Sequence, residues 1–217
     1  MSLEVKLRKR VEQLLASADE RGIRGPRLLD DARRLWSRVL HWVDVRHLIT
    51  PEPLERSALE LACHAVQLPL RAREIACAGR YGQVSLRDRA QQAAEELVSE
   101  FGDAIDEPLL DRTTILLQDL PSRTPTSEPA KLLADVLNLD DFGVTGLAGQ
   151  VAVLTLLGQG IDQLLEAADK RDAYGYWEAR LKDGFHFGPT REVARRRLER
   201  ARAAMKLLRE EMREMEG

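Results

Sequence analysis

The sequence predicts an all-α fold, and three observations support this prediction. Apolar residues recur at helical spacing along most of the 217 residues. Helix start signals precede many of these segments, and no run shows the two-residue period of a β-strand. With 44% hydrophobic and 32% charged residues, the composition is that of an ordinary soluble globular protein. No internal repeat or long linker interrupts the chain, so we expect a single helical domain over residues 4–215, with residues 1–3 and 216–217 as remnants of cloning.

The expected helices begin where the sequence supplies a start signal. Thr50-Pro51-Glu52-Pro53 predicts a Thr cap and a proline at the first helical position, where its missing N–H costs nothing. Residues 85–88 approximate a capping box, and Ser127-Glu128-Pro129 opens a helix after a turn-rich loop. With the apolar periodicity, these signals predict helices over residues 3–18, 27–45, from 51 towards 69, 85–101, 106–118, from 127 to before 143, 147–157, 161–168, 172–181 and from 189 to the end.

Charge and cysteine content argue against several classes of protein. The net charge of −3 at pH 7 provides no general attraction for nucleic acid or an anionic membrane. The longest apolar run, residues 151–157, is far shorter than a membrane span, and no secretory signal opens the chain. Cys63 and Cys77 are too few for a disulfide framework. We therefore expect a cytoplasmic protein without nucleic-acid or membrane partners.

The arginines of the C-terminal helix are a possible exception to this exclusion. Residues 191–202 contain six arginines. Glutamates lie among them and after them at spacings of three and four residues, which favours ion pairs along a solvated helix. We therefore interpret this segment as a charged helix surface rather than a nucleic-acid site.

Residues 132–146 carry the most specific motif of the chain. Their sequence, LLADVLNLDDFGVTG, resembles the last signature of the HD-domain superfamily of metal-dependent phosphohydrolases, roughly ILxDADxLDxxGxxG. Residues 88–97, Glu128 with Lys131, and residues 172–208 resemble further segments of one HD subfamily in the same order. The resemblance implies an all-helical bundle of the HD type. It also implies histidine and aspartate side chains that converge on one or two divalent ions, which polarise a phosphoryl group and activate a water.

In the signature itself, the metal ligand that the resemblance implies is missing. The second acid of the family's DAD falls on Leu137, which has no atom that can bind a cation. The first acid is Asp135, and its place in the family is structural. Two residues along a helix correspond to a rotation of about 200°, so Asp135 points away from the ligand position. A slip of the register would rescue Asp135 as a ligand, but it would break the match at Leu139-Asp140 and Gly143.

Other ligand positions fall in earlier helices. Arg33-Arg34-Leu35-Trp36 matches the family's xRRVW, which puts the first histidine of the pattern at Asp31. The HD dyad falls on Val66-Gln67 in one register and on His64-Ala65 in another, and neither register restores the dyad. On its largely apolar helix, His64 is expected to be a hydrogen-bonded core histidine, whereas His41 and His47 are expected at the surface.

These positions define a predicted vestigial pocket. The histidines of a later family helix fall on Thr113 and Gln118. Because a buried polar group left unpaired costs about 1–3 kcal/mol, we expect Gln118 and Asp31 to be hydrogen-bonded to neighbours such as Arg34, or to water. No metal is expected at this pocket. Its candidate residues are Asp31, Arg34, His64, Gln67, Gln118, Asp135, Leu137 and Asp140.

The resemblance and the missing ligands together predict a pseudoenzyme. In this hypothesis an HD-fold protein without a metal cofactor binds a ligand, such as a small phosphorylated molecule, or a partner. The alternative is a diverged phosphohydrolase that uses a divalent metal ion and acts on a phosphorylated small molecule or nucleotide. A third hypothesis is a purely structural or interaction role, served by the long C-terminal helix. The sequence assigns no substrate, partner or oligomeric state.

Overall fold

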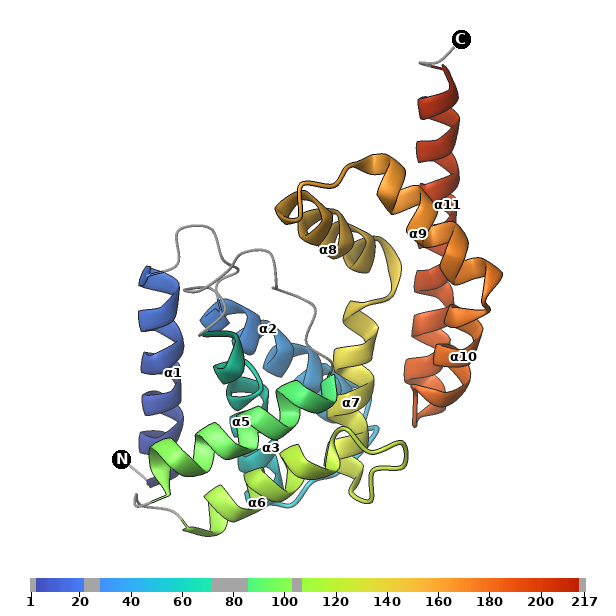
Figure 1. Cartoon of the computed structure of the whole chain (residues 1–217). Helices are drawn as coiled ribbons and strands as arrows, with labels where there is room; N and C mark the ends of the chain where they lie inside the picture. Colours follow the sequence, from blue (N-terminus) through green and yellow to red (C-terminus); the bar gives the residue numbers. More distant parts are fainter. Residues whose placement is uncertain (1–2, 22–27, 72–85, 103–106, 215–217) are drawn as a thin grey trace. The chain divides into compact units, whose positions relative to one another are not determined.

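The computed structural model describes residues 3–21, 28–71, 86–102 and 107–214. These residues form ten α-helices, one π-helix and one 3-10 helix, and none of them belongs to a β-strand, which confirms the all-α prediction (Figure 1). No described helix has both the length and the apolar character needed to cross a membrane. The contacts divide the chain into two compact units, Met1–Leu133 and Ala134–Gly217, and each is described by itself.

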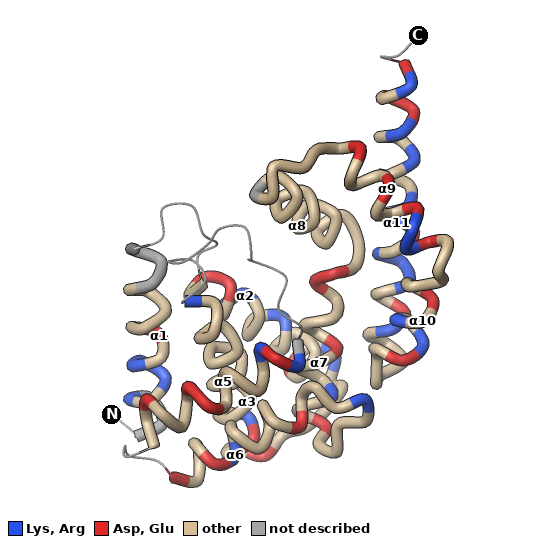
Figure 2. The backbone as a smooth tube through the Cα atoms, in the orientation of Figure 1, with Lys and Arg blue, Asp and Glu red and all other residues tan. Residues whose placement is uncertain are grey.

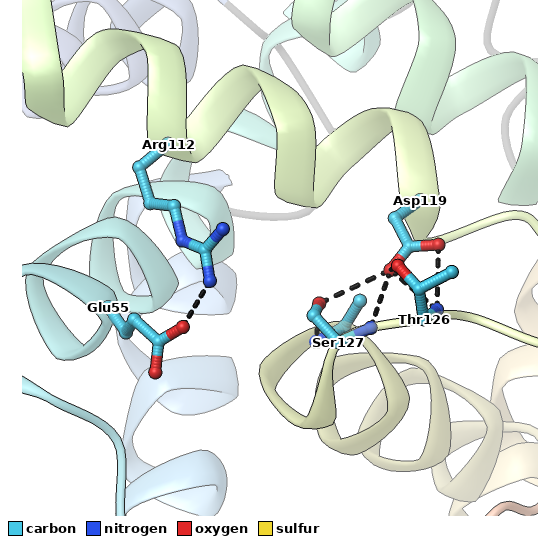
Figure 3. A network of polar contacts seen from close by, with 6 residues as sticks. Glu55, Arg112, Asp119, Thr126 and Ser127 are labelled. Carbon is cyan, nitrogen blue, oxygen red and sulfur yellow. Dashed lines mark hydrogen bonds and ion pairs between the residues drawn. The ribbon is translucent and has the colours of Figure 1, made fainter.

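The first unit is built around α3 and α6. Residues 61–70, which span the end of α3 and the whole of η2, are all buried. Apart from His64 and Gln67 this segment is apolar, as expected for a segment at the centre of a core. An ion pair between Glu55 of α3 and Arg112 of α6 joins the two helices at their surface (Figure 3). The elements of this unit are α1 (Leu3–Arg21), α2 (Leu28–Leu40), η1 (His41–Val45), α3 (Pro53–Ala65), η2 (Leu68–Leu70), α5 (Leu86–Phe101), α6 (Glu107–Asp119) and the first part of α7 (Glu128–Asp140).

The second unit contains the end of α7 and four further helices. α11 packs along α8 and α10, and α9 contacts both α8 and α10. Figure 2 shows that charged residues of both signs alternate along α11, whereas α8 carries none. A helix without charge is stable where neighbours cover part of it, and α11 supplies such a neighbour. The four helices are α8 (Gly143–Leu156), α9 (Ile161–Ala173), α10 (Tyr176–Asp183) and α11 (Gly188–Glu214).

Three of the predicted helix starts are wrong, and two of them are those of α3 and α10. Glu52, in an extended conformation, is the N-cap of α3 and Pro53 is its first residue, so Thr50 is not the cap. The helix expected over residues 172–181 begins at Tyr176. The preceding α9 continues to Ala173, and Gly175 ends it in the left-handed conformation with φ of 62°. The capping box predicted over residues 85–88 begins at Ser85, which lies outside the residues that the structure describes.

Other helix boundaries also differ from the prediction. α8 begins at Gly143, four residues before the expected start at residue 147. The backbone of Phe142 is extended, and the helix follows it directly. The segment expected as one helix over residues 27–45 is an α-helix that widens into the π-helix η1 from His41.

The predicted start of α7 is confirmed by its hydrogen bonds. The Ser127 hydroxyl accepts a hydrogen bond of 3.3 Å from the Ala130 N–H, as a helix cap does. Asp119, the last residue of α6, accepts hydrogen bonds from the backbone N–H and hydroxyl groups of Thr126 and Ser127 (Figure 3). Partial burial alone would raise the pKa of Asp119, but these hydrogen bonds lower it below its ordinary value of 3.8. The loop between α6 and α7 is therefore held at both ends.

Candidate functional site

The candidate residues of the first unit differ in burial. Asp31 lies in the first turn of α2, half-buried, where the helix dipole favours a carboxylate. It pairs with Arg34 one turn later, as expected. Gln118 is exposed on α6, so the expectation that its amide is buried is wrong. The neighbouring Leu116 and Leu117 occupy the buried side of α6, and Gln118 lies outside it.

His64 and Gln67 are both buried, at 2% and 5% exposure. The Nδ1 atom of His64 lies 2.9 Å from the backbone oxygen of Glu60, and its Nε2 atom lies 3.6 Å from a carboxylate oxygen of Glu12 on α1. His64 is therefore the packed core histidine that the sequence predicted. Within the described residues, no group of three or more His, Cys, Asp or Glu side chains is placed to hold a metal ion.

Asp135 has a structural position in the second unit. It is fully buried on α7, and its carboxylate accepts hydrogen bonds from the backbone N–H groups of His186 and Phe187 at 2.8 and 3.0 Å. The hydroxyl of Thr190, in the first turn of α11, donates a third. These groups surround the start of α11, so Asp135 acts as a cap supplied by another helix. Burial raises the pKa of the Asp135 carboxyl, although the three donors oppose this shift.

The end of α7 makes further contacts with the α10–α11 region. The Asn138 amide donates a 2.7 Å hydrogen bond to the Gly184 backbone oxygen and accepts one of 2.6 Å from Arg180. Arg197 of α11 donates to the Leu139 backbone oxygen at 2.8 Å. Of the other signature candidates, Leu137 and Asp140 are half-buried. Asn138, Arg180 and Arg197 were absent from the predicted site because their partners are distant in the sequence.

The two signature glycines have steric roles. Gly143 has a φ of +86°, and a Cβ atom at this position would lie 3.0 Å from the Cβ of Arg197 on α11. At Gly146, a Cβ atom would lie only 2.2 Å from the backbone oxygen of Asp141. Any side chain at these positions would change the turn from α7 into α8 and the approach of α8 to α11.

A pocket of about 250 Å³ lies among α8, α9, α10 and α11 of the second unit. The predicted vestigial-pocket residues are all absent from its lining. Phe142 and Trp177 meet edge to face at 5.1 Å on one side of the pocket. The apolar part of the lining consists of Phe142, Leu147, Ala168, Trp177, Leu198, Ala201 and Met205. The polar part consists of Asp141, Gln150, Arg171, Asp172, Arg202 and Arg209.

Most of the charged residues of the pocket are joined by ion pairs. Arg202 of α11 lies 2.8 Å from both Asp172 and Glu178, and these hydrogen bonds raise the pKa of its guanidinium. Arg180 lies 2.7 Å from Asp141, and its guanidinium lies over the Phe142 ring, 5.6 Å from the ring centre. These pairs tie α10 to α11 and to the α7–α8 turn. The pocket therefore combines an apolar interior with a charged rim.

The sequence contained one signal for this pocket. Six of the ten aromatic residues of the chain fall within residues 142–187, although this segment is about a fifth of the length. Aromatic side chains bury large areas and favour edge-to-face pairs, so this local enrichment indicates a cluster.

Comparison with known proteins adds no information on the family or the function, because no protein-family model, curated protein or solved structure matches the chain.

Proposed function

We propose that this chain is a non-catalytic, ligand-binding protein of the HD-domain type, and that the pocket of the second unit is its binding site. The HD assignment rests on the order of the sequence segments that resemble this family. The conclusion that it is non-catalytic rests on the residues at the implied ligand positions. Leu137 offers no donor, and Val66-Gln67 or His64-Ala65 replaces the dyad.

The environment of the remaining donors supports the non-catalytic role. A catalytic metal site needs several oxygen or nitrogen ligands and an open position for water and substrate. Asp31 is paired with Arg34, and Asp135 is engaged by three donors at the start of α11. Both carboxylates therefore have protein partners that a metal ion would have to displace.

The pocket is the observation that carries the binding proposal. Binding sites for small molecules are concave and mostly apolar, with a few polar groups that orient the ligand. The pocket has this composition, because aromatic and aliphatic side chains form its interior and arginines, aspartates and a glutamine complete it. In this proposal the ligand is a small molecule that buries an apolar body against Phe142 and Trp177.

A neutral fluorescent probe tests whether this pocket binds ligands. N-phenyl-1-naphthylamine, which is apolar and aromatic, is expected to bind with increased fluorescence. Ala201→Trp places an indole in the pocket and is expected to weaken binding more than about tenfold, which corresponds to about 1.4 kcal/mol. Ala203→Trp is the matched control, because Ala203 is exposed on the same helix. If Ala201→Trp keeps its helical circular dichroism and binds the probe as the wild type does, the pocket is not the site.

Metal-dependent hydrolysis tests the alternative function. With p-nitrophenyl phosphate as substrate, we expect Mn²⁺, Mg²⁺ and Zn²⁺ to produce no rate above that of the metal ions alone. Without a set of ligands to hold the ion, no bound water is acidified near neutral pH. The Asp31→Ala variant should behave identically. A stoichiometric transition metal in the purified protein that is lost in Asp31→Ala would contradict the proposal and favour a phosphohydrolase.

A further inference from the structure

Arg171 differs from the other arginines of the pocket in its partners. Its guanidinium donates a hydrogen bond to the neutral amide of Gln150 on α8 and lies 5.9 Å from the centre of the Tyr176 ring. By contrast, Arg202 and Arg209 of α11 each contact carboxylates. Among the described residues, Arg171 is thus the pocket arginine whose charge is not matched by a carboxylate within ion-pair distance.

The hydrogen-bonding capacity of Arg171 is not exhausted by Gln150. A guanidinium carries five N–H donors in a planar fork that suits two oxygens of one acidic group. Arg171 is half-buried, so solvent and salt screen a partner charge less than they would at an exposed site. An acidic group at this position would gain a charge-assisted contact without breaking an existing ion pair.

The two carboxylates of the lining, unlike Arg171, already have partners of opposite charge, so they do not favour a cationic ligand. Asp141 is paired with Arg180, and Asp172 is paired with Arg202. A cation would have to compete with these arginines for its counter-charge. The available charge in the pocket is therefore positive, and it lies beside an apolar interior.

We propose that the pocket binds a small organic anion, with an aromatic or aliphatic body against Phe142 and Trp177 and an acidic head group on Arg171. Carboxylate, sulfonate and phosphate heads share the oxygen geometry that this arginine recognises. This inference rests on the proposed function, since it specifies the ligand class of the same pocket. It further predicts that a head group without an apolar body, such as inorganic phosphate, binds weakly.

Two probes with the same body separate the contribution of the head group. 1-Anilinonaphthalene-8-sulfonate is N-phenyl-1-naphthylamine with one added sulfonate. Arg171→Met keeps much of the apolar stem and removes the charge. We expect it to weaken binding of the sulfonate probe about tenfold while binding of the neutral probe changes less than about twofold. Lys170→Met is the matched control, because Lys170 is exposed on the same helix outside the pocket and pairs with Glu166. This control should change neither affinity.

The outcomes distinguish this inference from the proposed function. If Arg171→Met leaves the ratio of the two affinities unchanged while Ala201→Trp still weakens both probes, the pocket binds ligands but does not select anions. If Ala201→Trp weakens neither probe, the proposed function itself is wrong. Arg171→Lys keeps the charge without the fork, and we expect it to lower the affinity ratio by a few-fold. If Arg171→Met does not fold, Arg171→Lys tests the inference in its place. An unchanged ratio of the two probe affinities in Arg171→Lys would then overturn the inference.

Discussion

Replacing Asp135 by alanine is expected to lower the free energy of unfolding by about 4 kcal/mol, because it removes a buried cap and leaves its donors unpaired. The backbone N–H groups of His186 and Phe187 and the hydroxyl of Thr190 would lose their acceptor at the start of α11. Urea denaturation followed by circular dichroism measures the loss. Hydrogen exchange at the first turn of α11 should show reduced protection.

Two further variants control this prediction. Asp183→Ala removes an exposed carboxylate from α10 and should change stability by no more than about 0.5 kcal/mol. Asp135→Asn keeps the shape and one acceptor oxygen, so its loss should be smaller than that of the alanine variant. A loss below about 1 kcal/mol in Asp135→Ala would show that the buried hydrogen bonds do not stabilise the unit.

The raised pKa of Asp135 predicts a pH dependence of these differences. Burial raises the pKa above the ordinary value of 3.8, so the folded state binds the proton more strongly than the unfolded state does. The resulting stabilisation is fully present below 3.8 and is lost as the pH rises through the folded-state pKa. The stability of the wild type minus that of Asp135→Asn should therefore be larger just above pH 3.8 than at neutral pH. Urea denaturation at the two pH values measures this difference, and the opposite sign would contradict the assignment.

Replacing Phe142 by alanine is expected to cost about 4 kcal/mol of stability, within the range for removing a buried phenylalanine ring. The ring is 1% exposed, and it meets the Trp177 and Phe185 rings edge to face at 5.1 and 5.3 Å. The guanidinium of Arg180 lies 5.6 Å from its centre. Removal leaves a cavity and deletes both aromatic pairs at once, and urea denaturation measures the result.

The control for this prediction is Tyr174→Ala, since Tyr174 is 86% exposed and its removal should change stability very little. Phe142→Leu should cost less than the alanine variant because it refills part of the cavity. Phe142 also lines the pocket, so the affinity for N-phenyl-1-naphthylamine should fall in Phe142→Ala. A small loss of stability together with unchanged probe affinity would show that the ring is peripheral to both the core and the pocket.

The sequence predictions that the structure confirms rest on caps and apolar patterns that act within one or two helical turns. Ser127 caps the helix that it was predicted to open, and the apolar segment around His64 is buried as its composition indicated. The end of α9 was harder to predict, because Gly175 breaks the helix only by adopting a positive φ. A glycine tolerates that conformation but does not require it.

The charges of α11 show the same division between local and distant partners. Glu192 with Arg195 forms a pair of the predicted kind within the helix, and Lys206 with Glu210 forms another at a spacing of four residues. Arg202 instead contacts Asp172 and Glu178, whose positions relative to it depend on how α9 and α10 fold back. Spacing along one helix predicts the pairs within α11, but it does not predict pairs with residues of other helices.

The sequence by itself determined the all-α class, most of the helices and the burial of His64, because periodicity and caps are local properties. It also singled out residues 132–146, but only the tertiary structure decided what this segment does. Asp135 and its donors are separated by 51, 52 and 55 positions, and Asn138 lies 46 positions from its Gly184 partner. The pocket likewise forms only when α8, α9, α10 and α11 pack together. Contacts between such distant residues depend on helix packing, for which a single sequence carries no local signal.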